Sequence, residues 1–132
     1  MPRLTDRHFA GLLGVRSAIA TFEQISEREA RAAGTTHAQH HVLLGLHSPS
    51  NSAGPTVKDI ARALGVASPS AVELIARMVT TGLLQRHADP DDGRVTRLRP
   101  TALGDRLLRQ LSEAHLPRLR ELSARSVELL TD

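Results

Sequence analysis

The chain has 132 residues, 40% of them apolar, and a formal net charge of +3, which suits one folded domain with a moderate core. It contains no cysteine, which excludes disulfides, thiolate metal sites and cysteine redox switches. The sequence has no apolar run of membrane-spanning length and no signal-peptide segment at its start, so we expect a cytoplasmic protein that does not enter the membrane.

The first predicted helix spans residues 5–33. Thr5 is placed to cap its start, and Gly34 ends it. Its apolar face is formed by Leu12, Val15, Ile19 and Phe22. The charged residues of its last turns, Glu29 among them, are expected in solvent. A long terminal helix has little of a small domain to pack against, so we expect a partner chain to cover this face.

A second helix is predicted at residues 37–46, HAQHHVLLGL, followed by a Ser-, Pro- and Gly-rich loop at 47–55. His37 and His41 share one helix face, and their i, i+4 spacing suits two metal ligands. A third ligand would have to come from His8, His115 or Asp105. The alternative is that these histidines are capping, surface or pocket-lining groups.

A pair of short helices follows. The first opens at Thr56, with Asp59 as the second half of a capping box. Its apolar stripe is Val57, Ile60, Ala61 and Leu64. Gly65 ends it, and after two residues Ser68 is a good N-cap before Pro69 at the first helical position. Helices joined by so short a turn cross steeply, which predicts a helix-turn-helix.

The second helix of the pair is the candidate recognition helix, closed by Gly82. Its predicted buried stripe is Val72, Ile75, Ala76 and Val79. The opposite, polar face carries Ser70, Glu73, Arg77 and Thr81. Such a face fits a DNA major groove, where the first helical turn, with Ser68 and Ser70, contacts base edges. The alternative is that Ser68 only caps the helix and the polar face is only solvated.

Two strands, residues 83–88 and 94–99, are predicted on either side of an Asp-rich turn. A hairpin beside a recognition helix is a wing. Arg94 lies at its tip, where a guanidinium is able to enter the narrow, electronegative minor groove. Asp92 would hold that side chain through a charge-assisted hydrogen bond. The alternative is a surface turn with a weak ion pair.

The last predicted helix starts at Thr101, which is able to cap it. Its first apolar stripe is Leu103, Leu107, Leu108 and Leu111. Pro117 interrupts it, and a second stripe is carried by Leu119, Leu122, Ser126 and Leu129 or Leu130. Residues 1–46 and 101–132 would form a helical dimerisation region attached to a lobe at 56–100. The alternative is a monomeric helical bundle.

The runs SAVELIARMVTTGLL and ADPDDGRVTRLRPTALG resemble the recognition helix and wing of the MarR family of bacterial transcription regulators. The Asp-x-Arg of that family's wing falls on Asp92 and Arg94, and its Thr-x-x-Gly falls on Thr101 and Gly104. Pro100 departs from the usual Leu. Because proline lacks a backbone donor, we expect the second strand to end before it.

The resemblance implies a mainly α fold with a small β-hairpin wing, a winged helix-turn-helix with terminal dimerisation helices. It also implies a homodimer that binds double-stranded DNA at a palindromic operator, usually as a repressor that responds to a small-molecule effector. The effector cleft of the family would here be lined by Arg16, Phe22, His37, His40 and His41. A metal-responsive regulator that uses His37 and His41 is an alternative.

The predicted DNA contacts fall into two groups. Phosphate contacts are expected from Lys58, Arg77, Arg86 and Arg97. Base contacts are expected from Ser68, Ser70 and Glu73. Glu73 occupies a position where many family members carry an uncharged polar or basic residue; a carboxylate repels phosphates but accepts from the cytosine amine. Together with the acidic wing turn, Glu73 leaves open a winged helix that binds protein partners instead of DNA.

The sequence offers no recognisable catalytic constellation. It has no cysteine nucleophile, no phosphate-binding glycine loop and no His-Glu-x-x-His motif. We therefore expect neither an enzyme nor a bound cofactor.

Overall fold

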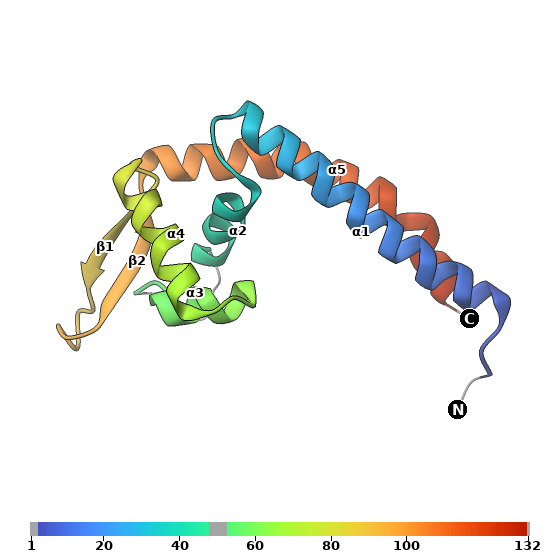
Figure 1. Cartoon of the computed structure of the whole chain (residues 1–132), viewed down its shortest axis with the longest axis horizontal. Helices are drawn as coiled ribbons and strands as arrows, with labels where there is room; N and C mark the ends of the chain where they lie inside the picture. Colours follow the sequence, from blue (N-terminus) through green and yellow to red (C-terminus); the bar gives the residue numbers. More distant parts are fainter. Residues whose placement is uncertain (1–2, 48–52, 132) are drawn as a thin grey trace. The chain divides into compact units, whose positions relative to one another are not determined.

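The computed structural model describes residues 3–47 and 53–131. Its elements in chain order are α1 (Asp6–Ala32), α2 (His37–Leu46), α3 (Val57–Leu64), α4 (Ser68–Thr80), β1 (Leu84–Ala88), β2 (Thr96–Pro100) and α5 (Ala102–Leu130), as Figure 1 shows. The predicted class, mainly α with one β-hairpin in a winged helix-turn-helix, is confirmed.

The chain divides into two compact units. One comprises Met1–Gly34 and Leu111–Asp132, and the other comprises Thr35–Gln110. The predicted division put α2 with the terminal helices and began the lobe at residue 56. The structure instead gives α2 to the second unit, because Val42, Leu43 and Leu46 belong to that unit's hydrophobic core.

The core of the second unit joins α2, the helix pair, the hairpin and the start of α5. Its buried members are Val42, Leu43, Leu46, Ile60, Ile75, Met78, Leu83, Leu84, Leu98 and Leu108. Burying a side chain of this size stabilises a fold by about 1.5–3 kcal/mol, so these ten side chains are a major favourable contribution to the packing of α4 and the hairpin. The core therefore fixes the elements that were predicted to meet DNA.

The helix starts that were predicted from Thr5 and Thr56 are confirmed, since these residues are the N-caps of α1 and α3. Thr36 caps α2, with its side chain accepting from the Gln39 N–H. At α3 the capping box is complete: Thr56 Oγ1 accepts from the Asp59 N–H at 3.2 Å, and Asp59 accepts from the Thr56 N–H at 3.0 Å. The hydrogen bond from the Thr56 N–H to the Asp59 carboxylate is the main reason why the pKa of Asp59 is lowered.

The start and the phase of α4 differ from the prediction. Ala67, not Ser68, is the N-cap, because its carbonyl accepts the first helical N–H groups, those of Ser70 and Ala71. The buried stripe is Ala71, Ile75 and Met78. Val72 and Ala76 therefore lie on the exposed side of the helix.

The hairpin pairs β1 with β2 in antiparallel register, from Leu84 opposite Pro100 to Ala88 opposite Thr96. The prediction that β2 ends before Pro100 was wrong. The Leu98 N–H bonds the Pro55 carbonyl, outside the hairpin, and the Thr101 N–H bonds the Leu83 carbonyl across it. Because these directions alternate along a strand, the position of Pro100 needs no donor toward β1.

The turn from β2 into α5 explains the Thr-x-x-Gly motif. Thr101 Oγ1 accepts from the Gly104 N–H at 3.1 Å and donates to the Gly82 carbonyl. A Cβ on Gly104 would collide with the Leu83 carbonyl oxygen. Any larger residue would therefore push α5 away from the core. Beyond this turn, α5 continues through Pro117 as one helix, contrary to the predicted interruption.

In the first unit, α1 and the C-terminal half of α5 pack closely through small residues. A Cβ on Gly11 would meet the side chains of Leu129 and Leu130, and a Cβ on Gly14 would meet that of Ser126. The pair is antiparallel, since the start of α1 contacts the end of α5. Its shared face is narrow and leaves other apolar side chains of both helices uncovered.

Glu29 is not in solvent as predicted, but joins the two helices of this unit. Its Oε2 lies 2.9 Å from His115 Nε2, and its Oε1 lies 3.2 Å from Arg118 Nη2. His115 is buried and stacks edge-on against Phe22, with ring centroids 5.6 Å apart.

The predictions of a loop at 47–55 and of no membrane-spanning segment are compared here with the described residues alone. Most of the loop predicted at 47–55, residues 48–52, lies outside the described residues. Among helices that are described, none combines the length and the apolar character needed to cross a bilayer.

Candidate nucleic-acid interface

The helix-turn-helix is built by α3, α4 and the turn between them. Gly65 takes φ +69°, a conformation that favours glycine, and lets the chain reverse after α3. The exposed side of α4 then carries the residues predicted to read bases and its neighbours: Ser68, Ser70, Val72, Glu73, Ala76 and Arg77. The structure thus leaves the three predicted base-reading residues, Ser68, Ser70 and Glu73, exposed in the first two turns of α4.

Glu73 and Arg77 form an ion pair one turn apart on this face. Arg77 Nη2 lies 2.6 Å from Glu73 Oε1, and both side chains are about two-thirds exposed. The pair offsets the negative charge that made Glu73 unfavourable near phosphates. The pair engages Arg77 through Nη2, and because a guanidinium has five N–H donors, it does not prevent Arg77 from also contacting a phosphate.

The turn of the wing is organised by Asp89. One of its carboxylate oxygens accepts from the N–H groups of Asp91 and Asp92, at 2.8 and 2.9 Å. The other accepts from the guanidinium of Arg97. The hydrogen bond from Arg97, reinforced by those two N–H groups, lowers the pKa of Asp89. An acidic loop that looked unfavourable for DNA is thus partly neutralised within the hairpin.

The predicted pair at the wing tip is present. Asp92 Oδ1 lies 3.1 Å from Arg94 Nε, and its Oδ2 lies 3.3 Å from Arg94 Nη2. This contact is the main cause of the lowered pKa of Asp92. The Arg94 side chain is still 92% exposed. It is therefore oriented by Asp92 and open to a partner.

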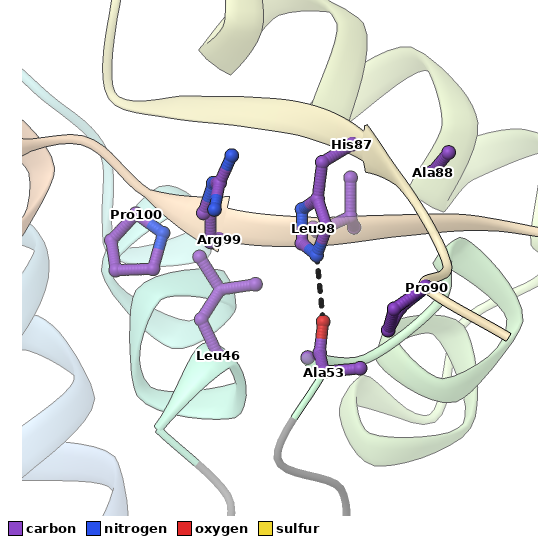
Figure 2. A pocket seen from close by; sticks show the side chains of 9 residues that line it. Leu46, Ala53, His87, Ala88, Pro90, Leu98, Arg99 and Pro100 are labelled. Atoms are coloured by element: carbon purple, nitrogen blue, oxygen red, sulfur yellow. Dashed lines mark hydrogen bonds between the residues drawn. The ribbon is translucent and has the colours of Figure 1, made fainter.

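The wing is fastened to the segment before α3 by three consecutive carbonyls. Those of Ala53, Gly54 and Pro55 accept from His87 Nε2, Arg97 Nη1 and the Leu98 N–H, at 2.8, 2.9 and 2.8 Å. Figure 2 shows the first of these contacts. A Cβ on Gly54, whose φ is +94°, would collide with the Leu98 carbonyl. These contacts hold the wing in a fixed position relative to α3.

Sequence reasoning did not foresee this fastening. Its donors and acceptors are about 35 to 45 residues apart in the chain, and four of the six groups belong to the backbone. The one signal was Gly54-Pro55 before a helix cap, which indicates a tight turn without naming its partner. As a result Arg97, predicted as a phosphate contact, has its guanidinium bound to Asp89 and Gly54.

The remaining predicted cations are accessible. Lys58 lies in the first turn of α3 and Arg86 in the middle of β1, and both are exposed. Arg99, on β2, is exposed as well but was not included in the predicted contact set. Its two-residue spacing from Arg97 was the available signal.

The histidines do not assemble into a metal site within the described residues. There, no three His, Asp or Glu side chains come together in a way that would hold an ion. Asp105, one candidate third ligand, pairs with Arg109 at 2.9 Å and with His47 at 3.2 Å. The metal-responsive alternative remains a prediction based only on the spacing of His37 and His41.

The predicted effector residues belong to different parts of the chain. Arg16 and Phe22 lie on α1 of the first unit. The three histidines lie on α2 of the second, where His40 is buried, His41 is exposed and His37 is intermediate. A cavity of about 560 Å³ lies beside the wing (Figure 2) and is lined by Leu46, Ala53, Gly54, His87, Ala88, Pro90, Leu98, Arg99 and Pro100. The predicted pocket residues do not line this cavity.

Residues 33–95, which contain α2, the helix-turn-helix and the wing up to Val95, match the profile of the MarR family. This region belongs to the MarR family. The match spans α4 and the Asp92–Arg94 pair of the wing, which were also the basis of the sequence resemblance. A search of curated proteins gave no match.

Solved MarR-type structures share the fold. The MepR–DNA complex of S. aureus has a TM-score of 0.72 and 21% identity, and the match covers 83% of this chain and 78% of MepR. Wild-type MarR from E. coli, in its apo form, has a TM-score of 0.70 and 20% identity, with 83% of this chain and 80% of MarR covered. A mutant of MarR from E. coli in complex with operator DNA has a TM-score of 0.66 and 19% identity, with 89% of this chain and 79% of MarR covered.

Proposed function

We propose that this MarR-family transcription regulator is a cytoplasmic homodimer that binds a palindromic operator in double-stranded DNA and represses transcription until an effector binds. The observation that carries the proposal is the exposed polar face of α4 beside a wing whose tip arginine is oriented and open. Structures of DNA complexes among the proteins of similar fold support it.

We assign the proposed DNA contacts according to which side chains are exposed. Lys58 and Arg86 contact phosphates, and Arg94 enters the minor groove. Arg77, which is paired with Glu73 in the free protein, also contacts a phosphate. Arg97 positions the wing, since its guanidinium is held by Asp89 and Gly54. Base reading is assigned to Ser68, Ser70 and Glu73.

The homodimer is supported by the uncovered apolar side chains of the first unit. Those more than about half exposed on α1 and α5 are Phe9, Leu12, Leu13, Ile19 and Val127. Neighbouring positions on α5, Leu116, Leu119 and Leu130, are exposed to a lesser degree. So many apolar groups on two long helices mark an interaction surface. A second copy of the chain would cover them by two-fold symmetry and set two recognition helices about one DNA turn, roughly 34 Å, apart.

Regulation by an effector rests on the family resemblance. The proposed ligand is a small molecule. It would lower DNA affinity only if it bound the DNA-free arrangement of the dimer better than the DNA-bound one. Screening small acids for loss of a preformed protein–DNA complex tests this part.

The DNA-binding proposal is tested by selecting duplexes from a random pool with the purified protein, then measuring affinity by fluorescence anisotropy at two salt concentrations. We expect an enriched inverted repeat, bound more tightly than its scrambled version and more weakly at higher salt. Failure to enrich any sequence would refute sequence-specific binding.

A winged helix that docks a protein partner is the second candidate. The exposed carboxylate of Glu73 in the middle of the α4 face favours it. Measuring affinity at several salt concentrations distinguishes the two functions. Binding to DNA releases counterions from the phosphates, so the affinity for DNA falls steeply as the salt concentration is raised. Weak binding that salt does not change would support the protein-docking function.

A further inference from the structure

Val72 lies in an unexpected place on α4. Its i, i+3, i+4 spacing from Ile75 and Ala76 predicted burial, yet the structure leaves its side chain 51% exposed. Met78 and Ala71 take the buried positions of this helix instead. Val72 lies one turn after Ser68 and one turn before Ala76, both of which are exposed. An apolar side chain is therefore present on the exposed side of α4, the helix proposed to enter the major groove.

Neither fold stability nor helix formation accounts for a valine here. Half of its surface remains in water, so burial contributes less than at a core position. Its branched Cβ also makes it a weaker helix former than alanine or the straight-chain polar residues. The branching has one local effect: it restricts χ1 in a helix to one strongly preferred rotamer, so both methyl groups point in fixed directions.

The major groove offers one apolar group to such a side chain, the C5 methyl of thymine. Its other features are hydrogen-bond donors and acceptors, which Ser70 and Glu73 are able to read and Val72 is not. We propose that Val72 packs against the C5 methyl of a thymine in each half-site and so makes the operator thymine-specific at that position. This inference rests on the proposed DNA-binding function, and it assigns one base of the site.

The test uses deoxyuridine, which differs from thymidine only in that its base lacks this methyl group. The operator is first selected from random duplexes with the wild-type protein. Each symmetric pair of thymines is then replaced by uracil, and affinity is measured by anisotropy. At one pair we expect wild-type affinity to fall about fourfold per half-site, the effect of removing one buried methyl group. Val72→Ala should bind the thymine and uracil operators equally.

Val66→Ala is the matched control. Val66 is an exposed valine in the turn before α4, and its truncation removes the same two methyl groups. This variant should keep the full uracil penalty. Circular dichroism melts of both variants check that the fold is unchanged, as expected for exposed side chains.

The possible outcomes distinguish a failure of the proposed DNA binding from a failure of the proposed role of Val72. If the wild-type protein enriches no sequence, the proposed function fails and this inference falls with it. If it enriches an operator but tolerates uracil at every thymine, or if the half-sites lack thymine, DNA binding stands and the role of Val72 is overturned. A uracil penalty that persists in Val72→Ala would also overturn it.

Discussion

Two arginines of the wing, Arg94 and Arg97, have similar neighbours in the sequence but different surroundings in the structure. Arg94 and Arg97 both pair with aspartates, but Arg94 is 92% exposed whereas the Arg97 guanidinium is enclosed by Asp89 and the Gly54 carbonyl. This difference in exposure is why we propose Arg94 as a DNA contact and Arg97 as a residue that positions the wing.

Replacing Arg94 by alanine should weaken binding to every duplex, specific or scrambled. A guanidinium in the minor groove contributes charge without reading much sequence, so we expect about a tenfold loss and a salt dependence lower by about one charge per protomer. Anisotropy titrations at several salt concentrations measure both. Arg31→Ala, which removes an exposed arginine of α1, is the control and should leave affinity unchanged. Equal affinity of Arg94→Ala and wild type would contradict the wing assignment.

The carboxylate of Asp89 predicts a pH dependence of stability. Its pKa in the folded protein is lowered from the ordinary 3.8, first by the hydrogen bond from Arg97. The charged form therefore stabilises the fold fully above the unfolded pKa of 3.8, and this contribution decreases as the pH falls below 3.8 towards the lower folded pKa. Asp89→Asn should be less stable than wild type at pH 6, and the difference should be smaller at pH 2.5. Urea unfolding midpoints at the two values measure it.

The comparison variant for that experiment is Asp91→Asn. Asp91 is exposed at the same turn and supplies only its backbone N–H to the Asp89 carboxylate. Its difference from wild type should be small at both pH values. A constant difference for Asp89→Asn down to pH 2.5 would mean that the Arg97 contact does not stabilise the charged form of Asp89 over the neutral form.

At the scale of elements, the packing of α1 against α5 depends on a carboxylate that reaches a buried imidazole. Glu29 meets both His115 and Arg118, and its side chain is 23% exposed. Glu27, half a turn away, forms a 2.9 Å ion pair with Arg31 on the surface of the same helix. The two glutamates differ mainly in burial.

Glu29→Ala should lower the free energy of unfolding by about 1–3 kcal/mol, because it removes a partly buried acceptor opposite two cationic or hydrogen-bonding groups. Glu27→Ala should cost about 0–1 kcal/mol, as for other exposed pairs. Chemical unfolding of both variants at equal protein concentration provides the comparison. Similar losses for the two would show that the cluster around His115 contributes no more than a surface ion pair.

Local signals predicted the elements well where the deciding contacts lie within a few residues. The bounds of α2, the capping box of Thr56 with Asp59, the left-handed turn at Gly65 and the Asp92–Arg94 pair all follow from neighbours in the chain. Each involves groups no more than four residues apart. They were sufficient to predict a winged helix-turn-helix.

The errors arose where the deciding contact is distant. The phase of α4 depends on which residues meet the core, and the spacings 71, 75, 78 and 72, 75, 79 fit a helix equally well. Pro100 fits in β2 because Leu98 bonds Pro55, a partner 43 residues away. Glu29 was assigned to solvent because its partner His115 lies on another helix. Periodicity carries no information about such contacts.

At the scale of the whole molecule, the proposal requires two chains. The apolar side chains uncovered on α1 and α5 supply the surface, and the palindromic operator follows from the two-fold axis of a dimer. A monomer would present a single recognition helix and would have no reason to prefer an inverted repeat.

Leu13→Glu should convert the dimer into a folded monomer. Leu13 is 67% exposed on α1, so a carboxylate is tolerated in the isolated chain but is desolvated when a partner covers it. Sedimentation should give twice the chain mass of 14.3 kDa for wild type and a value near that mass for the variant. Thr21→Glu adds the same charge at an exposed polar position of α1, on the side away from Phe9, Leu12 and Ile19, and should stay dimeric. A wild-type protein that sediments as a monomer at micromolar concentration would refute the dimer.

The most direct measurement compares the selected operator with a duplex in which one half-site has been scrambled. Anisotropy gives the affinity, and sedimentation of the complex gives the number of chains bound. We predict two chains on the intact operator and at least a tenfold loss of affinity on the half-scrambled duplex, because one recognition helix and one wing lose their specific contacts. Equal affinity for the two duplexes, or one chain bound to the intact operator, would contradict a dimer that reads a palindrome.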